Sequence, residues 1–130
     1  MTKIKVGING FGRIGRTAFR SWWMFHRDRI DLKAINTSGS MPVGDWVHLL
    51  KYDSNYGILN EPITFTQTQK PKEATDENPV IGSILVGGRT ITVTAQRDPA
   101  KIPWGTLGVE TVVESTGAFT SADKAGLHLQ

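Results

Sequence analysis

The chain has 130 residues, of which 38% are hydrophobic and 21% charged, and it contains 14 glycines. This length suits a single domain, and the balance is that of a globular protein rather than a disordered, fibrous or membrane-embedded chain. No cysteine is present, which excludes disulfides and thiolate metal sites. The formal charge is +3, with Lys and Arg interspersed among Asp and Glu, a mild cationic bias that suits a phosphate-bearing ligand.

The amino terminus runs directly into a strand pattern, in which Ile4, Val6 and Ile8 alternate. No apolar stretch precedes it that suits a signal peptide or a membrane span. We therefore expect a cytoplasmic protein with no membrane partner.

A helix and a second strand follow. After Gly15, apolar residues recur at spacings of three and four, which predicts a helix with one wide apolar face: Ala18, Phe19, Trp22, Trp23 and Phe25. A short apolar run from Ile30 to Ile35 predicts the strand. The first 36 residues thus form a strand-helix-strand crossover, whose two strands should be parallel neighbours.

The middle of the chain predicts another helix, a polar excursion and a hairpin. Pro42 opens a helix that should end near Tyr52. Residues 66–79 are polar and contain two prolines, which indicates a surface excursion. Two apolar runs, 84–86 and 90–93, flank Gly87-Gly88, and paired glycines allow the positive φ angles of a tight hairpin turn.

The last strand is expected over 109–113, followed by a turn at 115–117 and a helix that begins near Thr120 or Ser121. The fold class is therefore α/β, with a Rossmann-like, doubly wound, mainly parallel sheet and an antiparallel hairpin insertion. The expected helix still continues at Gln130, so we expect residues 1–130 to be an incomplete dinucleotide-binding domain, truncated before completion.

A glycine motif lies between the first strand and the first helix. Gly10-Phe11-Gly12-Arg13-Ile14-Gly15 fits G-x-G-x-x-G, in which the first glycine permits a tight turn, the second lets a pyrophosphate approach and the third allows close helix packing. An ordinary glycine-rich turn is the alternative. Arg13 is either a cationic phosphate contact or a solvated residue at the helix start.

The acidic residue that this motif expects about 20 positions later is absent, because the second strand ends in Asn36-Thr37-Ser38. A carboxylate there repels a 2′-phosphate by about 4 kcal/mol per charge at 4 Å and an effective dielectric constant of 20. Its absence favours dual or NADP-leaning specificity, with hydrogen bonds from Thr37, Ser38 and the Gly39 backbone to the phosphate. Alternatively, Thr37 contacts the ribose of NAD.

Longer segments carry a resemblance to a known family. Residues 5–16 and 113–120 resemble phosphorylating glyceraldehyde-3-phosphate dehydrogenase, as do, in the same order, 50–54, Arg97-Asp98-Pro99 and Trp104-Gly105. The resemblance covers essentially the whole chain. It implies an NAD- or NADP-dependent enzyme that oxidises and phosphorylates glyceraldehyde 3-phosphate to 1,3-bisphosphoglycerate in glycolysis or gluconeogenesis, as a homotetramer when full length.

The resemblance also implies which residues meet the dinucleotide. By resemblance, the pyrophosphate is surrounded by Asn9, Gly10, Phe11, Gly12, Arg13 and Ile14, Arg97 lies by the adenine, and the adenosine side of the cleft is lined by Ser115, Thr116, Gly117 and Phe119. The expected site also includes Asn36, Thr37 and Ser38, from the end of the second strand discussed above. Without the family, Ser115 and Thr116 suggest only turn and cap chemistry.

No catalytic residue is assigned. The family's cysteine nucleophile and histidine base would lie beyond Gln130, so the catalytic domain is expected to be absent from this chain and the fragment inactive. His26, His48 and His128 fall on predicted helices without ligand spacing, so no metal site is expected. The alternative function is a stand-alone, non-catalytic nucleotide-binding or interaction module, and a nucleic-acid partner is disfavoured.

Overall fold

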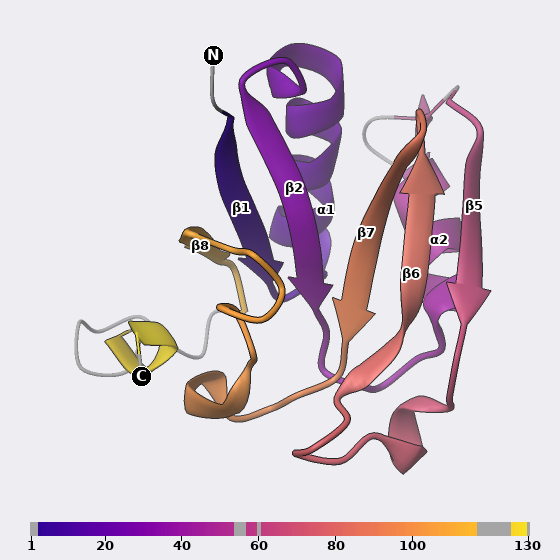
Figure 1. Ribbon diagram of the computed structural model, residues 1–130. Helices are drawn as coiled ribbons and strands as arrows, with labels where there is room; N and C mark the ends of the chain where they lie inside the picture. The colour runs from indigo at the N-terminus through magenta and orange to yellow at the C-terminus, as the bar shows by residue number, and fades with distance from the viewer. Residues whose placement is uncertain (1–2, 54–56, 60, 117–125, 130) are drawn as a thin grey trace.

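The computed structural model describes residues 3–53, 57–59, 61–116 and 126–129. Within these ranges, one sheet has the strand order β5-β6-β7-β2-β1-β8 (Figure 1). Its strands are β1 (Ile4–Asn9), β2 (Ile30–Asn36), β5 (Ile63–Gln67), β6 (Val80–Val86), β7 (Arg89–Thr94) and β8 (Thr111–Glu114). A separate short pair joins β3 (Tyr52–Asp53) to β4 (Gly57–Ile58).

The central strands run parallel. β1 pairs in parallel with β2 on one side and with β8 on the other, and β2 pairs in parallel with β7. The chain thus leaves β1 toward β2 and later returns to the opposite edge of β1, which is the switch of direction that defines a doubly wound sheet. The predicted α/β class is confirmed, and the switch lies between the carboxyl ends of β1 and β8.

The first crossover is confirmed, with one correction in its helix. The helix α1 (Arg13–Ser21) continues into a π-helical turn, η1 (Trp22–His26). In a π-helix each hydrogen bond spans five residues instead of four, so the positions after Trp22 fall out of the α-helical spacing. Trp22 and Trp23 remain buried, but Phe25, expected on the apolar face, is 73% exposed.

The hairpin between β6 and β7 is confirmed, with Gly87 and Gly88 at φ angles of 55° and 75° in its turn. Strand β5 was not predicted, because Thr66 and Gln67 were assigned to the polar excursion. It is an edge strand that pairs, among the described residues, with β6 alone, and it buries Ile63 while its other four residues are exposed. Its apolar alternation is limited to Ile63 and Phe65 before the chain turns polar, which is too short a pattern to predict a strand.

Apolar residues cover both faces of the sheet. On one face lie α1 and α2 (Val43–Lys51), both behind the sheet in Figure 1, with a large buried cluster that includes Phe19, Trp46 and Ile84. On the other face, Trp104 and Ile102, from the segment between β7 and β8, pack against Ala34. The indole of Trp104 lies so close to β1 that a Cβ at Gly7 would be 2.6 Å from it.

A buried arginine joins the two helices. Arg20 of α1 is 7% exposed and donates through Nε and Nη2 to the Leu50 carbonyl oxygen, at 3.1 and 2.8 Å. Its Nη2 also donates to the carbonyl oxygens of Lys51 and Gly57, at 3.1 and 2.8 Å. These acceptors belong to the carboxyl end of α2 and the chain just beyond it, where orphan carbonyls and the helix dipole both favour a cation.

Three other expectations have mixed outcomes. The last strand is confirmed at β8, and Pro42 occupies the cap position before α2, which begins at Val43. The helix expected from Thr120 or Ser121 begins outside the described residues, and the short 3-10 helix η4 (Gly126–Leu129) is what the structure describes at that end.

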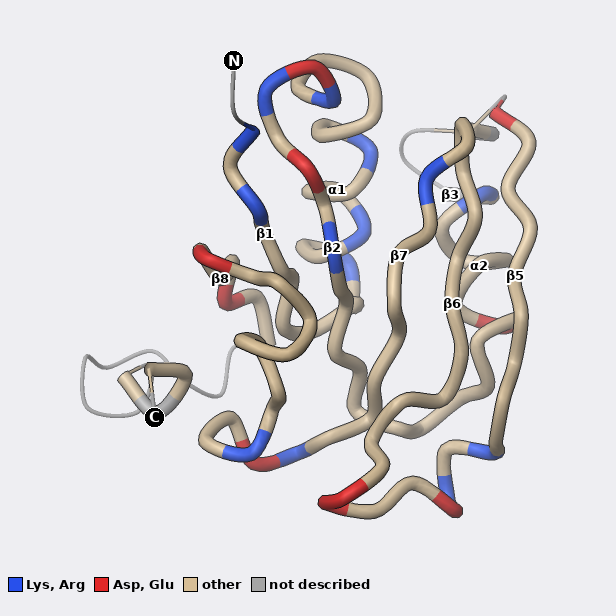
Figure 2. Tube along the Cα trace, in the orientation of Figure 1, with Lys and Arg blue, Asp and Glu red and all other residues tan. Residues whose placement is uncertain are grey.

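Both signs of charge occur along most of the chain, whereas the charged residues of α1 are all basic (Figure 2). Among the described residues, none belongs to a helix with the length and hydropathy of a membrane span.

Candidate functional site

A row of polar side chains crosses the carboxyl ends of the parallel strands. Thr94, Asn36, Asn9 and Glu114 are register partners on β7, β2, β1 and β8. Thr94, Asn36 and Asn9 are at most 3% exposed. We call these four residues the polar row. Buried polar groups must find hydrogen-bond partners, and these find them in one another.

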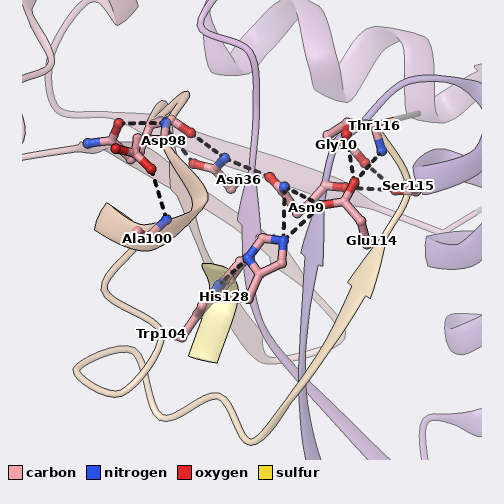
Figure 3. Close-up of polar contacts among 11 residues, drawn as sticks. Asn9, Gly10, Asn36, Asp98, Ala100, Trp104, Glu114, Ser115, Thr116 and His128 are labelled. Carbon is pink, nitrogen blue, oxygen red and sulfur yellow. Dashed lines mark hydrogen bonds and ion pairs between the residues drawn. The ribbon is translucent and has the colours of Figure 1, made fainter. Parts of the chain in front are cut away.

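The donors of the polar row all point the same way. Thr94 Oγ1 donates to Asn36 Oδ1 at 2.6 Å. Asn36 Nδ2 donates to Asn9 Oδ1 at 2.8 Å, and Asn9 Nδ2 donates to Glu114 Oε1 at 2.7 Å (Figure 3). The chain of bonds ends on a carboxylate. In such a chain each bond polarises the next, so the row behaves as one rigid unit.

Glu114 receives several donors at the end of the row. Burial disfavours its charged form, but hydrogen bonds from Thr116, His128 and Asn9 outweigh that effect and lower the pKa of the Glu114 carboxyl. His128 Nε2 lies 2.8 Å from Glu114 Oε1, and Trp104 Nε1 donates to His128 Nδ1 at 3.0 Å (Figure 3). Because an indole N–H only donates, Nδ1 is the acceptor and Nε2 carries the proton toward Glu114.

The turn that follows β1 needs two of its three glycines for its own geometry. Gly10 has a φ of 94°, and a Cβ there would lie 2.9 Å from the Thr116 backbone nitrogen. A Cβ at Gly15 would lie 2.0 Å from the Gly10 carbonyl oxygen. The turn is also held by Ser115, whose Oγ is 2.9 Å from the Asn9 carbonyl oxygen and 2.8 Å from that of Gly10.

Gly12 differs from the other two glycines. Its φ of −74° and ψ of −157° are open to any residue, and a Cβ at this position would meet none of the described residues within 4 Å. Neither its backbone angles nor the packing of the described residues therefore requires glycine here. Gly12 is the N-cap of α1 and offers no side chain to the helix end, whose first turn holds no acid.

A cavity of about 370 Å³ opens above this turn. It brings together most of the predicted site residues: Asn9, Gly10, Phe11, Gly12, Asn36, Thr37, Ser38, Arg97, Ser115 and Thr116. Arg13 and Ile14 are the first residues of α1, both exposed, and do not line it. Gly117 and Phe119 lie outside the described residues.

Two lining residues were missed by sequence reasoning. Trp46 of α2 lines the cavity and meets Phe11 edge to face, with ring centroids 6.2 Å apart. Its helical spacing predicted only a buried position, and it is indeed 7% exposed. Gln96 also lines the cavity and is 7% exposed, and its only sequence signal was its place next to Arg97.

Thr37 does not offer its hydroxyl to the cavity as expected. The side chain is 2% exposed, and Oγ1 donates to the Thr94 carbonyl oxygen at 3.0 Å, which uses its only proton. The neighbouring groups are more accessible. Ser38 and Ser40 are exposed, with their hydroxyl oxygens 2.9 Å apart, and the exposed Arg97 donates from Nε to the Ser38 carbonyl oxygen at 3.3 Å.

A larger cavity, of about 830 Å³, lies elsewhere. It borders β8 and is lined by Trp104, Glu114 and His128 among others, and it contains none of the glycine turn. Its size alone does not indicate a ligand site. The smaller cavity combines a glycine turn, the start of a helix and the carboxyl ends of β1 and β8, where the sheet switches direction. Within the part of the chain that the structure describes, no group of three His, Asp or Glu side chains could hold a metal ion.

Comparison with known proteins also indicates a dinucleotide-binding domain. Residues 4–122 match the model of the family described as glyceraldehyde 3-phosphate dehydrogenase, NAD binding domain. The chain is 44% identical over 126 residues to glyceraldehyde-3-phosphate dehydrogenase 1 of Streptomyces arenae, covering 97% of this chain and 33% of that protein. It is 43% identical over 130 residues to the enzyme of Priestia megaterium, covering 98% of this chain and 32% of the relative. It is also 41% identical over 128 residues to the chloroplastic glyceraldehyde-3-phosphate dehydrogenase A of Nicotiana tabacum, covering 98% and 29%.

The chain therefore spans about a third of the length of the curated relatives that it matches. The family model covers nearly all of the chain, including the turn after β1, the polar row and the loop that follows β8. This protein belongs to the family of NAD-binding domains of glyceraldehyde-3-phosphate dehydrogenase.

Proposed function

We propose that the 370 Å³ cavity binds the adenosine and diphosphate parts of a nicotinamide dinucleotide. Gly12 carries this proposal. Among the described residues, it is the one glycine of the motif that neither a positive φ nor a close contact demands, and it lines the cavity. A diphosphate brought against the backbone at Gly12 explains the missing side chain.

The start of α1 supplies the matching charge. The first N–H groups of a helix have no partner within it, and the helix dipole makes that end positive. Here the cap residue offers no side-chain acceptor and the first turn contains no acid. A diphosphate would therefore accept from backbone N–H groups that are otherwise left to water.

Two members of the polar row, Asn9 and Asn36, line the cavity and give it a rigid floor. Their side-chain amides donate within the row and to the Gln96 carbonyl oxygen, so they shape the site and leave the ligand contacts to the loops above. Phe11 and Trp46 add an apolar wall on the α2 side. An apolar wall with a few fixed polar groups suits an aromatic base attached to a charged chain.

We propose further that the site accepts NADP as well as NAD, with dual or NADP-leaning preference. Position 37 holds threonine, so no carboxylate stands where a 2′-phosphate would lie. The phosphate would be met by the Ser38 and Ser40 hydroxyls and by the Arg97 guanidinium, and Thr37 would contribute only its small volume. Arginine suits this role because its planar fork of donors matches phosphate oxygens.

The reaction that we propose for the whole protein is that of the named relatives. The 130 residues would hold the dinucleotide for the oxidation and phosphorylation of glyceraldehyde 3-phosphate in a cytoplasmic homotetramer. This sequence contains no cysteine, so the nucleophile would come from residues outside it, and residues 1–130 would be an incomplete dinucleotide-binding domain. Relatives named as that dehydrogenase, at 44% and 43% identity, support this proposal.

Titration calorimetry with NAD and NADP tests the two binding proposals. We expect both nucleotides to bind, and a preference for NAD of about tenfold or more would contradict dual specificity. Thr37→Asp should weaken NADP binding by at least about tenfold, because a carboxylate at 4 Å repels the phosphate by roughly 4 kcal/mol per charge. Thr37→Asn is the matched control, since it loses the same hydroxyl without adding charge, and it should leave the NADP to NAD ratio near the original.

A further inference from the structure

The polar excursion between β5 and β6 is joined to the cavity by one carboxylate. Asp76 Oδ1 accepts a hydrogen bond from Gln96 Nε2 at 3.0 Å, and Oδ2 accepts from Lys101 Nζ at 2.9 Å. The excursion lies near the cavity in a second place, because a Cβ at Gly39 would be 4.0 Å from the Pro71 Cβ. Asp76 itself is exposed, so its side chain is no part of the core.

Gln96 is fixed by four hydrogen bonds. Its backbone N–H donates to Asn36 Oδ1 at 2.9 Å, and its carbonyl oxygen accepts from Asn36 Nδ2 at 2.7 Å. Its Oε1 accepts from the Asp98 N–H at 3.0 Å, and its Nε2 donates to Asp76. The backbone bonds join Gln96 to the polar row, while the side-chain bonds hold the loop that contains Arg97.

We propose that Asp76 is a positioning residue, which acts through Gln96 to hold Arg97 at the rim of the cavity and so tightens binding of the 2′-phosphorylated dinucleotide. The inference rests on the proposed function above. Asp76 itself does not line the cavity. It orients the Gln96 amide, which in turn fixes the backbone of Asp98 on the far side of Arg97.

The arrangement explains why one exposed carboxylate affects the rim. Arg97 itself is exposed and has one bond of its own, from Nε to the Ser38 carbonyl oxygen. Ordering a long side chain on binding costs conformational entropy and so weakens affinity. A backbone that is already held in place reduces this entropy cost. Asp98 is fixed as well, since its Oδ1 accepts from the Ala100 N–H at 3.0 Å.

Charges around Asp76 agree with this role. The hydrogen bond from Gln96, followed by the bond and the charge of Lys101, lowers the pKa of the Asp76 carboxyl, so it is ionised at neutral pH. Lys101 also faces the charges of Asp98 and Glu77. Glu77 therefore makes a matched control, because it is a neighbouring carboxylate that acts on Lys101 by charge and has no part in holding Gln96.

The test compares four variants of the protein, Asp76→Ala, Asp76→Asn, Glu77→Ala and Lys101→Met. Asp76→Ala should raise the dissociation constant for NADP about fivefold, and that for NAD by no more than about twofold. Asp76→Asn should bind NADP nearly as the original does, because its Oδ1 still accepts from Gln96. Glu77→Ala and Lys101→Met should also stay near the original. Thermal unfolding should show all four folded.

The second measurement is the rate of hydrogen exchange at the Asp98 amide, monitored by NMR in the ligand-free protein. Exchange should be faster in Asp76→Ala than in Asp76→Asn, since only the former releases the Gln96 side chain. Unchanged exchange in Asp76→Ala, or equal NADP binding by Asp76→Ala and the original, overturns the inference, and so does a loss in Asp76→Asn or Glu77→Ala as large as in Asp76→Ala. Faster exchange in a protein that binds neither nucleotide overturns the proposed function instead, and the nucleotide role of Asp76 with it.

Discussion

Replacing Gly12 with alanine separates the demands of the ligand from those of the fold. The added methyl group meets nothing within 4 Å, and the backbone angles of Gly12 suit alanine. Such a substitution raises the free energy of unfolding by about 0.4–1 kcal/mol, because it restricts the unfolded chain. The same methyl group would occupy space where the proposed diphosphate approaches the backbone. Overpacking of this kind costs about 1–3 kcal/mol, which weakens binding by roughly fivefold to 150-fold.

Gly15→Ala is the matched control, because the same methyl group there lies 2.0 Å from the Gly10 carbonyl oxygen. It should lower the free energy of unfolding by about 1–3 kcal/mol, since the turn must move to admit it. Urea denaturation gives the stability of each variant, and calorimetry gives the dissociation constants for NAD and NADP. If Gly12→Ala binds both nucleotides within about twofold of the original, the reasoning from Gly12 to a diphosphate site is refuted.

Three other substitutions probe groups that hold the site. Arg20→Met should lower the free energy of unfolding by about 3 kcal/mol in urea denaturation, because buried carbonyls lose a charged donor. An Arg20→Lys variant as stable as the original would contradict this dependence on the guanidinium group. Asn36→Asp should cost about 3 kcal/mol or more in the same assay, because two donated hydrogen bonds become contacts between acceptors, and a stable variant would show that the polar row is not rigid. Hydrogen bonds lower the pKa of Glu114, so its carboxylate stabilises the fold above the ordinary value of 4.5, and this stabilisation is lost as pH falls through the folded value. Glu114→Gln should therefore flatten the profile of stability against pH below 4.5, and an unchanged slope would exclude Glu114 as its source.

The sequence predicts the fold best where local pattern and tertiary structure agree. The alternation in β1, the glycine turn and the paired Gly87-Gly88 each have a local physical cause, and all three appear as expected. Strand β5 was missed because its apolar alternation is limited to Ile63 and Phe65 before the chain turns polar. The π-turn was missed because the apolar spacing was taken as that of an α-helix throughout, and its effect is seen in the exposure of Phe25.

The candidate site was predictable to a similar degree. Residues of the glycine motif and of the loops after β2 and β8 line one cavity because the carboxyl ends of parallel strands share an edge. Trp46 could not be found in this way, since the pattern of α2 indicates burial only. Gln96 lies just beyond the carboxyl end of β7, and its only sequence signal was its place next to Arg97. The orientation of the Thr37 hydroxyl could not be predicted, because its bond to Thr94 joins segments that lie far apart in the sequence.

The polar row also has a consequence for how the sheet assembles. Side chains alternate between the two faces of a strand, so a pairing slip of one residue would turn Asn9, Asn36 or Thr94 toward the opposite layer. An amide or hydroxyl moved in this way would lose its partners in the row and would enter apolar surroundings without a hydrogen bond. The four side chains thus favour a single register of the parallel strands during folding, because only that register pairs them with one another.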